Sequence, residues 1–264
     1  MKIAAAQIAC SLGDVAANVQ KMREFAKRAA GNSADLVVFP ELSDTGYSMP
    51  VIERCAQRWS DGPVAALQTT AKDFSIALIA GVSERDEDII YNSQVFIDAS
   101  GKIIGKYRKT HLFRGRPAGE DECFQAGDEL RTFEFGELRL GLSICYDLRF
   151  PELFRMLAIE QRANVFILSS AWPFPRLEHL RTLTAARAIE NQSYLISVNR
   201  VGTDEGVTCC GSSSIIDPYG VLIASASADR EELVEGEISA EVIGLVRKRM
   251  AVFEHRRSDL YGER

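Results

Sequence analysis

Short apolar runs that alternate with helix-like segments constrain the fold of this chain more than any other feature of its sequence. The run LVVFPE at 36–41 is nearly all apolar, which is typical of a strand covered on both faces. The segment VAANVQKMREFAKRAA at 15–30 has the helical period, with Val19, Met22 and Phe25 on one side. The same alternation continues through strand-like runs at 2–9, 75–84, 138–147, 164–170, 193–202 and 233–239 and helix-like runs at 63–74, 151–163, 176–191 and 240–250. We therefore expect an α/β fold.

Two pairs of predicted strands lie too close together in the sequence to be joined by helices. Residues 89–98 and 102–110 flank Ala-Ser-Gly, and residues 212–227 surround Asp-Pro-Tyr-Gly, so both segments are interpreted as hairpins. A simple eight-fold β/α barrel or a Rossmann fold does not contain such hairpins. Because no Pro/Ser/Gly linker, repeat or low-complexity tract divides the chain, we predict one domain, residues 1–264, with two sheets and helices outside them.

Composition and charge restrict the kind of partner. Of the 264 residues 46% are hydrophobic, which is enough for a substantial core. The net charge is −6 and the charged residues are interspersed, which argues against nucleic acid or an anionic membrane surface as the main partner. No window approaches the length of a membrane span, and MKIAAAQIACSLG is interpreted as a first strand rather than a signal peptide. We expect a cytoplasmic protein.

The cysteines and histidines do not have the spacing of a metal site. Six cysteines are present, none in a C-x-x-C pair, and none of the three histidines is spaced with a cysteine as a zinc site requires. Cys209 and Cys210 are adjacent, which is a poor geometry for a disulfide. We expect reduced thiols, most of them buried, and no metal.

Two charged residues follow predicted strands. Glu41 comes directly after LVVFP, at the carboxyl end of a buried strand, where ligand crevices open in α/β sheets. A carboxylate against apolar surroundings has a raised pKa and can act as a base near neutral pH; the alternative is a solvated loop glutamate. Lys109 ends the next hairpin and can supply positive charge to a site, although most lysines lie on the surface.

Cys145 ends the run LRLGLSI and precedes a helix that begins near Pro151. A thiol there can face helix N–H groups that favour the thiolate, and nearby backbone N–H groups could hold an oxyanion. The alternatives are an inert buried cysteine and a Cys–His pair, for which His111 is the only plausible partner. Glu120 stands in a charged loop with Asp121 and Glu122, which position alone would assign to solvent.

Three stretches carry a resemblance to a known family. FPELSDTGY around Glu41, YRKTHLF around Lys109 and ICYDLRFPEL around Cys145 resemble the motifs of the nitrilase, or carbon–nitrogen hydrolase, superfamily. The likeness extends to SSAWPFPRLEHLRTLTAARAIENQSYLISVNRVG and SSSIIDPYG, and so covers nearly the whole chain. It implies a four-layer α-β-β-α sandwich that pairs with a second copy into an eight-layer α-β-β-α-α-β-β-α dimer, and it implies no metal or organic cofactor.

The resemblance also implies roles for single residues. Glu41 takes the proton of Cys145, whose thiolate attacks a non-peptide amide carbonyl and forms a thioester. Lys109 and the N–H of Tyr146 stabilise the oxyanion, and Glu41 then protonates the leaving ammonia and activates water. A second glutamate orients Lys109 or the substrate; Glu120 is the best match for it and Glu122 the alternative.

Within the superfamily, the short AGE loop, CYDLRFPE, AWPFPR and ARAIENQSYLISVNRVG resemble the ω-amidase-like branch. That likeness implies ω-monoamides of dicarboxylic acids such as 2-oxoglutaramate as substrates, and Arg149 and Arg176 are candidates to bind the distal carboxylate. A helix-start salt bridge for Arg149 and a surface position for Arg176 are the alternatives. Leu180 departs from the pattern, since many relatives carry Trp there, which could reshape one pocket wall.

Other functions remain open at this point. One alternative is another amidase of the superfamily, acting on deaminated glutathione, N-carbamoyl compounds or aliphatic amides, or a nitrilase. A third hypothesis is a non-catalytic scaffold of the same fold, although a scaffold does not need Glu41, Lys109 and Cys145 together. The resemblance implies a homodimer or larger homo-oligomer, for which the apolar helices at 151–163 and 176–191 could form the interface.

Overall fold

Two six-stranded sheets form the centre of the computed structural model, which describes residues 1–116 and 118–261. The strands of the first sheet, in spatial order, are β14 (Glu232–Glu237), β1 (Lys2–Gln7), β2 (Leu36–Val38), β3 (Ala77–Asp86), β4 (Ile89–Ile97) and β5 (Ile103–Arg108). Those of the second are β13 (Leu222–Ser225), β12 (Ser214–Ile216), β9 (Tyr194–Asn199), β8 (Val165–Ser170), β7 (Leu138–Ile144) and β6 (Thr132–Phe135).

Each sheet has a parallel centre and antiparallel edges. β1, β2 and β3 run parallel, as do β7, β8 and β9, while β4, β5 and β14 in one sheet and β6, β12 and β13 in the other pair antiparallel. The parallel strands are covered on both faces, which explains why their sequences are apolar runs without alternation. The two predicted hairpins are confirmed as β4–β5 and β12–β13.

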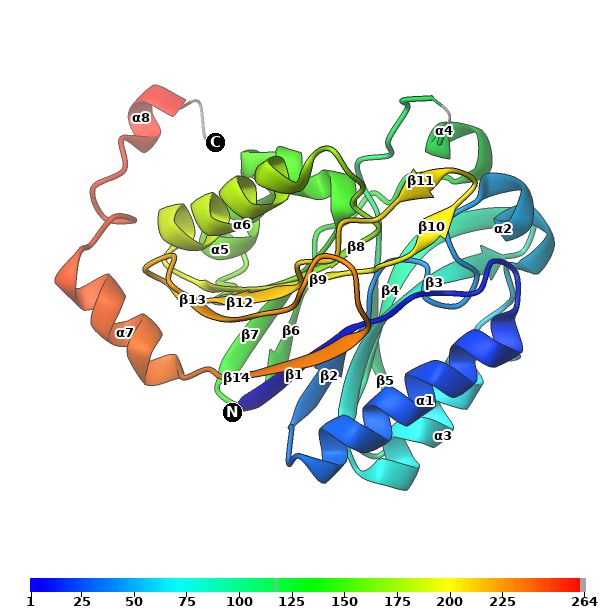
Figure 1. Ribbon diagram of the computed structural model, residues 1–264. Helices are drawn as coiled ribbons and strands as arrows, with labels where there is room; N and C mark the ends of the chain where they lie inside the picture. Colours follow the sequence, from blue (N-terminus) through cyan, green and yellow to red (C-terminus); the bar gives the residue numbers. More distant parts are fainter. Residues whose placement is uncertain (117, 262–264) are drawn as a thin grey trace.

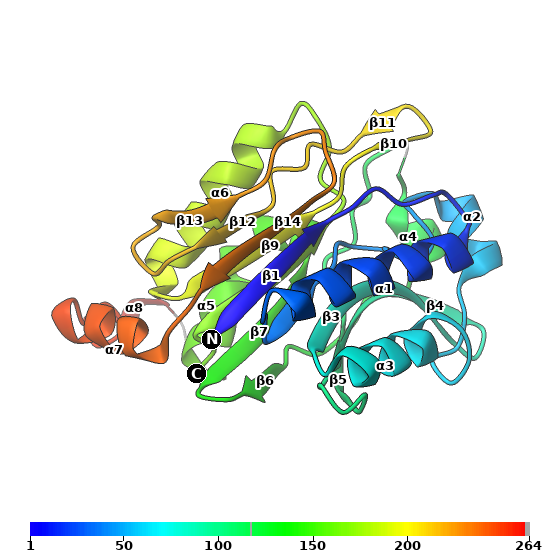
Figure 2. The same ribbon diagram turned by 60° about the horizontal axis from the view of Figure 1, so that its bottom comes forward.

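The sheets stack against each other and helices cover their outer faces. Inward side chains such as Val38 and Ile79 pack with Ile144 and Ile167 of the other sheet. The outer face of the first sheet is covered by α1 (Val15–Gly31) and α3 (Pro63–Phe74), and that of the second by α5 (Pro151–Ile159) and α6 (Leu177–Asn191). Figures 1 and 2 show the two helix pairs on opposite sides. The predicted α-β-β-α sandwich is confirmed.

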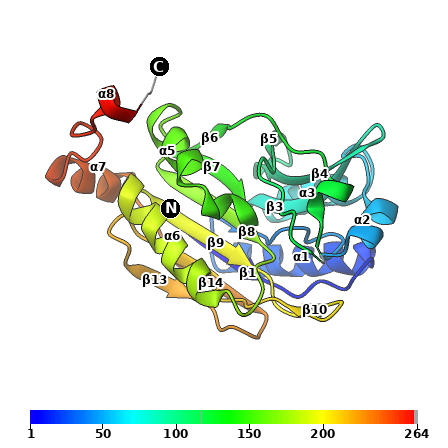
Figure 3. The same ribbon diagram turned by 90° about the horizontal axis from the view of Figure 1, so that it is seen from above.

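Several short elements escaped the sequence prediction. They are α2 (Met49–Cys55), α4 (Glu120–Cys123), β6, the 3₁₀ turn η1 (Cys145–Arg149), β10 (Thr203–Asp204), β11 (Val207–Thr208) and α8 (Ser258–Tyr261). Figures 1 and 3 show α2, α4 and the β10–β11 hairpin gathered at one end of the sandwich. At the other end the chain leaves through α7 (Ala240–Arg249) and α8 (Ser258–Tyr261). In the described part of the chain, no helix combines the length and apolar character needed to cross a bilayer.

Candidate active site

Glu41 follows β2 and is fully buried, so it is not a solvated loop residue. Its Oε1 accepts hydrogen bonds from Asn92 Nδ2 at 2.7 Å and from Lys109 Nζ at 2.9 Å, and its Oε2 accepts one from the Ala171 N–H at 2.8 Å. A glycine on β3 makes room for it, because a Cβ at Gly81 would come within 2.6 Å of the Glu41 Cα. The end of β2, the space left by Gly81 and the three hydrogen-bond donors together fix the position of the Glu41 carboxylate.

Lys109 follows β5 and connects two carboxylates inside the protein. Its Nζ donates to Glu41 and, at 2.7 Å, to Glu120 Oε1, and all three side chains are fully buried. Burial by itself would lower the pKa of Lys109, but the charges of Glu120 and Glu41 outweigh it and raise the pKa well above its ordinary value. Lys109 is therefore a fixed positive charge rather than a surface residue.

Glu120 begins α4 and faces inward, whereas Glu122 faces solvent. Glu120 Oε1 also accepts from the Tyr47 hydroxyl at 2.5 Å, and its Oε2 accepts from the Phe113 N–H at 2.8 Å. Burial raises the pKa of Glu120, although the charge of Lys109 opposes the shift. Glu122 forms an ion pair with Arg116 on the surface. Of the two candidates, only Glu120 contacts Lys109.

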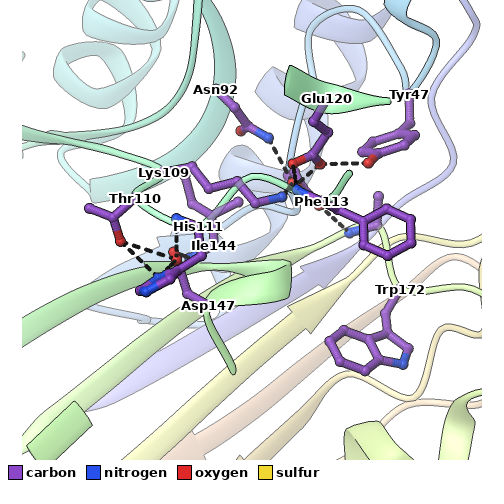
Figure 4. Close-up of polar contacts among 12 residues, drawn as sticks. Tyr47, Asn92, Lys109, Thr110, His111, Phe113, Glu120, Ile144, Asp147 and Trp172 are labelled. Atoms are coloured by element: carbon purple, nitrogen blue, oxygen red, sulfur yellow. Dashed lines mark hydrogen bonds and ion pairs between the residues drawn. The ribbon is translucent and has the colours of Figure 1, made fainter. Parts of the chain in front are cut away.

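Cys145 occupies a strained turn directly after β7. Its φ is +45°, a left-handed conformation that costs a residue other than glycine about 1–2 kcal/mol. The buried Asp147 holds this turn: its Oδ2 accepts from the Ile144 N–H at 2.9 Å and from the Tyr107 hydroxyl at 2.8 Å. Its Oδ1 lies 2.8 Å from His111 Nδ1 (Figure 4). The structure thus pairs His111 with Asp147 rather than with Cys145, which corrects the Cys–His alternative.

The thiol of Cys145 is not a preformed thiolate. Burial raises its pKa well above the ordinary value, and the charges of Glu41 and Glu120 add to the shift, while Lys109 and the Ala171 N–H act in the opposite direction. The sequence suggested helix N–H groups that favour the thiolate, whereas desolvation and two carboxylates favour the neutral thiol. Nucleophilic attack from this position needs a base that takes the proton.

Two adjoining cavities lead to Cys145. The inner cavity, about 40 Å³, is lined by Cys145, Tyr146, Arg149 and Trp172 together with Tyr47, Phe113 and Arg176. The outer cavity, about 310 Å³, shares the last three of these residues. Leu180, where the sequence departs from the family pattern, lines neither cavity and packs in the core under α6.

Both candidate arginines line the inner cavity. Arg149 places its guanidinium 4.8 Å from the centre of the Trp172 ring, and its Nη2 lies 3.3 Å from His179 Nδ1. Arg176 lies 5.7 Å from the centre of the Phe113 ring. Neither has an acidic partner within residues 1–116 and 118–261, so the salt bridge considered for Arg149 is not formed there. Two uncompensated positive charges therefore face the inner cavity.

Tyr47, Asn92, Asp147 and Ala171 were not singled out from the sequence. Three of them carry no charge, and Ala171 acts only through its backbone, so no pattern of residue types marks them. Tyr47 and Asp147 lie inside the quoted motifs FPELSDTGY and ICYDLRFPEL, and Ala171 lies in the quoted stretch that begins SSAWPFPR; their place in these stretches is the signal available for them. In the described residues, no group of three or more His, Cys, Asp and Glu side chains could hold a metal ion.

A four-layer α-β-β-α sandwich that sets a partly buried cysteine beside a buried lysine and two buried glutamates defines the class of hydrolases that cleave carbon–nitrogen bonds. The family model for carbon–nitrogen hydrolases matches residues 2–248, and the chain belongs to this family.

Named relatives and a solved structure agree with this assignment. The chain is 35% identical to the 2-oxoglutaramate amidase of Bacillus subtilis (strain 168), over 98% of each chain. It is 30% identical to the human omega-amidase NIT2, over 92% of this chain and 91% of the relative. The crystal structure of Saccharomyces cerevisiae Nit3, a member of branch 10 of the nitrilase superfamily, superposes with a TM-score of 0.88 at 30% identity and covers 97% of this chain and 96% of Nit3.

Proposed function

We propose that this amidase hydrolyses ω-monoamides of dicarboxylic acids, such as 2-oxoglutaramate, to the dicarboxylate and ammonia. The observation that carries the proposal is the pair of guanidinium groups, Arg149 and Arg176, in the same cavity as the Cys145 thiol. A substrate with a carboxylate a few bonds from its amide would meet both charges while its carbonyl faces the thiol. The names of the relatives from Bacillus subtilis and human support the same substrate class.

The first half of the reaction forms a thioester. Glu41 accepts the proton of Cys145 as the sulfur attacks the amide carbonyl, and the carbonyl oxygen takes the negative charge. The ammonium group of Lys109 and the backbone N–H of Tyr146 stabilise that oxygen. Glu41 returns its proton to the nitrogen, the C–N bond breaks and ammonia leaves.

The second half releases the acid. Water enters, Glu41 takes a proton from it, and the resulting hydroxide attacks the thioester carbonyl. The C–S bond breaks and the proton returns to the sulfur, which regenerates the thiol. Glu120, held by Tyr47 and the Phe113 N–H, keeps Lys109 directed at the reacting oxygen throughout. Its role is positional, because its carboxylate binds Lys109, Tyr47 and the Phe113 N–H rather than the reacting thiol.

A substrate panel tests the proposal. Ammonia release is measured with 2-oxoglutaramate and succinamate, with butyramide as the neutral amide, and with glutamine, deaminated glutathione, an N-carbamoyl amino acid and a nitrile. We expect kcat/KM for succinamate to exceed that for butyramide by at least about tenfold, the effect of one charge-assisted hydrogen bond. In Arg149→Met and Arg176→Met this ratio should fall. A preference for butyramide, or an unchanged ratio in both variants, would refute the ω-amide assignment.

We also propose that residues 1–264 act as one domain that pairs with a second copy, in the cytoplasm. Exposed apolar side chains on α5, α6 and the β12–β13 hairpin support this pairing; Met156, Ile189 and Leu222 are 45%, 52% and 55% exposed. Sedimentation analysis tests it. We expect a dimer for the unmodified chain and a monomer for Ile189→Glu, and a monomeric unmodified chain would contradict the proposal.

A further inference from the structure

The outer cavity is larger than an ω-monoamide of five carbons requires. Its volume is about 310 Å³, in the range of about 300–1,000 Å³ that holds drug-sized ligands. A substrate such as 2-oxoglutaramate has only about ten non-hydrogen atoms, and part of it must occupy the inner cavity to reach Cys145. The outer cavity therefore has room for a group that the proposed substrate lacks.

The position of Ala171 indicates which side of the amide faces this space. Arg149 lines the inner cavity but not the outer one, and Ala171 lines the outer cavity but not the inner one. The Ala171 N–H holds Glu41 Oε2, the carboxylate that protonates the leaving nitrogen in the proposed mechanism. With the substrate carboxylate at Arg149, the leaving nitrogen points toward Ala171. A substituent on that nitrogen would extend into the outer cavity.

The charges of the outer cavity give the chemistry of this substituent. Arg176 lines this cavity where it adjoins the inner one. Asp204 lines the cavity but is ion-paired with Arg200, and Arg116 is ion-paired with Glu122. Glu205 lies at the turn between β10 and β11, near the α2 and α4 end seen in Figure 3. Its Oε1 accepts a hydrogen bond from the Ser48 hydroxyl at 2.9 Å, and no cation contacts it within the described ranges.

The rest of the lining suits an alkyl chain. Met49, Pro50, Phe174 and Val207 contribute apolar surface to the outer cavity. The two cavities thus hold Arg149 and the thiol in the inner cavity, Arg176 where the cavities adjoin, and an apolar lining with one uncompensated carboxylate in the outer cavity. This arrangement is complementary to a molecule with a carboxylate at one end, an amide near it and a cation at the far end.

We propose that the outer cavity is an amine-side subsite, through which the enzyme hydrolyses amides of dicarboxylic acids whose nitrogen carries an alkyl chain ending in an ammonium group bound by Glu205. The inference rests on the proposed function and extends its substrate class from primary to secondary amides. The chemistry is the same: the carbonyl–nitrogen bond breaks after the carbon–sulfur bond has formed. Glu41 passes the thiol proton to the leaving nitrogen, a diamine departs, and one water releases the dicarboxylate.

Four succinic acid derivatives test the proposal: succinamate, N-(4-aminobutyl)succinamate, N-pentylsuccinamate and N-(4-carboxybutyl)succinamate. The pentyl compound replaces the terminal ammonium by a methyl group at equal length, and the carboxybutyl compound reverses the charge. We expect kcat/KM for the aminobutyl compound to exceed that for the pentyl compound by about fivefold, the effect of a partly exposed ion pair. The carboxybutyl compound should be the poorest of the three. The aminobutyl preference should shrink as salt is added.

Variants show whether Glu205 is responsible. In Glu205→Gln the aminobutyl-to-pentyl ratio should fall to about one, whereas Glu160→Gln, an exposed glutamate after α5, should leave it unchanged. Val207→Trp fills the outer cavity and should lower the ratio of any N-substituted compound to succinamate. Equal rates for the aminobutyl and pentyl compounds, an unchanged ratio in Glu205→Gln, or hydrolysis of succinamate alone would overturn the subsite. Failure of the ω-amide assignment is separate, because it would appear as a preference for butyramide over succinamate.

Discussion

Replacing Lys109 by Met removes the only charge that separates two buried carboxylates. Lys109 Nζ lies 2.9 Å from Glu41 Oε1 and 2.7 Å from Glu120 Oε1, so these two oxygens are at most about 5.6 Å apart. Two negative charges at that distance repel each other by about 3 kcal/mol at an effective dielectric constant of about 20. Removing one partner of a buried ion pair typically costs about 3–5 kcal/mol. We expect Lys109→Met to lower the free energy of unfolding by that amount near neutral pH.

The loss of unfolding free energy in Lys109→Met should be larger at high pH than at low pH. A repulsion of about 3 kcal/mol corresponds to about two pKa units, so one carboxylate of the variant should stay protonated into the neutral range. A group whose pKa is higher in the folded than in the unfolded state gives stability that is present at low pH and lost as pH rises through the folded value. The variant should therefore approach the unmodified protein at about pH 5 and diverge toward pH 8, by up to about 1.4 kcal/mol per pH unit.

Guanidinium unfolding followed by circular dichroism at several pH values, at one protein concentration, measures this difference. Lys106→Met is the matched control, because Lys106 lies on β5 just before Lys109 but is 40% exposed beside Glu84, and it should cost less than about 1 kcal/mol. Adding Glu120→Gln to Lys109→Met removes one of the two charges and should restore part of the stability. A loss that is equal at pH 5 and pH 8, or a double variant no more stable than Lys109→Met, would refute the reasoning.

Three further outcomes can be measured. Cys145→Ala should abolish ammonia release while the protein keeps its circular dichroism spectrum, and Cys55→Ala should keep its activity; full activity in Cys145→Ala would exclude the thioester. In Glu41→Gln, hydrolysis should be lost, yet the pH midpoint of Cys145 alkylation by iodoacetamide should fall, because Glu41 raises the pKa of the thiol; an unchanged midpoint would contradict this coupling. Asp147→Ala leaves the Tyr107 hydroxyl and the Ile144 N–H without their acceptor and should cost about 3–5 kcal/mol in chemical unfolding, with a smaller loss in Asp147→Asn.

The fold could be predicted from the sequence because its central strands are buried on both faces. Runs such as those before Glu41 and Cys145 contain little but apolar residues, and that pattern requires layers on either side. The short elements could not be predicted in this way. The helix α2, the one-turn helix α4 and the two-residue strands β10 and β11 are held by contacts with distant segments rather than by periodicity. An example is the hydrogen bond from the Ser48 hydroxyl to Glu205 across 157 positions of sequence.

For the site, the sequence indicated which residue types follow the strands, but it did not indicate the environment of each side chain. Strand ends predicted Glu41, Lys109 and Cys145 as site residues. Glu41 and Lys109 follow β2 and β5, which run in the same direction and so end at one edge of their sheet. The ionisation state of Cys145 could not be predicted, since local sequence suggested helix N–H groups and contained no measure of desolvation. His111 was the only plausible histidine partner for the thiol, but the buried Asp147 two residues after Cys145 binds it instead.

The raised pKa of the Cys145 thiol is compatible with catalysis because the proton stays inside the buried cluster. Burial makes it costly to create a new charge, and a thiol that lost its proton to solvent would add one beside Glu41 and Glu120. Transfer of the same proton to Glu41 moves a negative charge from oxygen to sulfur and leaves the number of charges around Lys109 unchanged. Desolvation therefore opposes loss of the Cys145 proton to solvent much more than it opposes transfer of that proton to Glu41 during the attack. A cysteine activated in this way stays protonated until an amide occupies the inner cavity, which is the physical reason for setting a nucleophile beside a buried base.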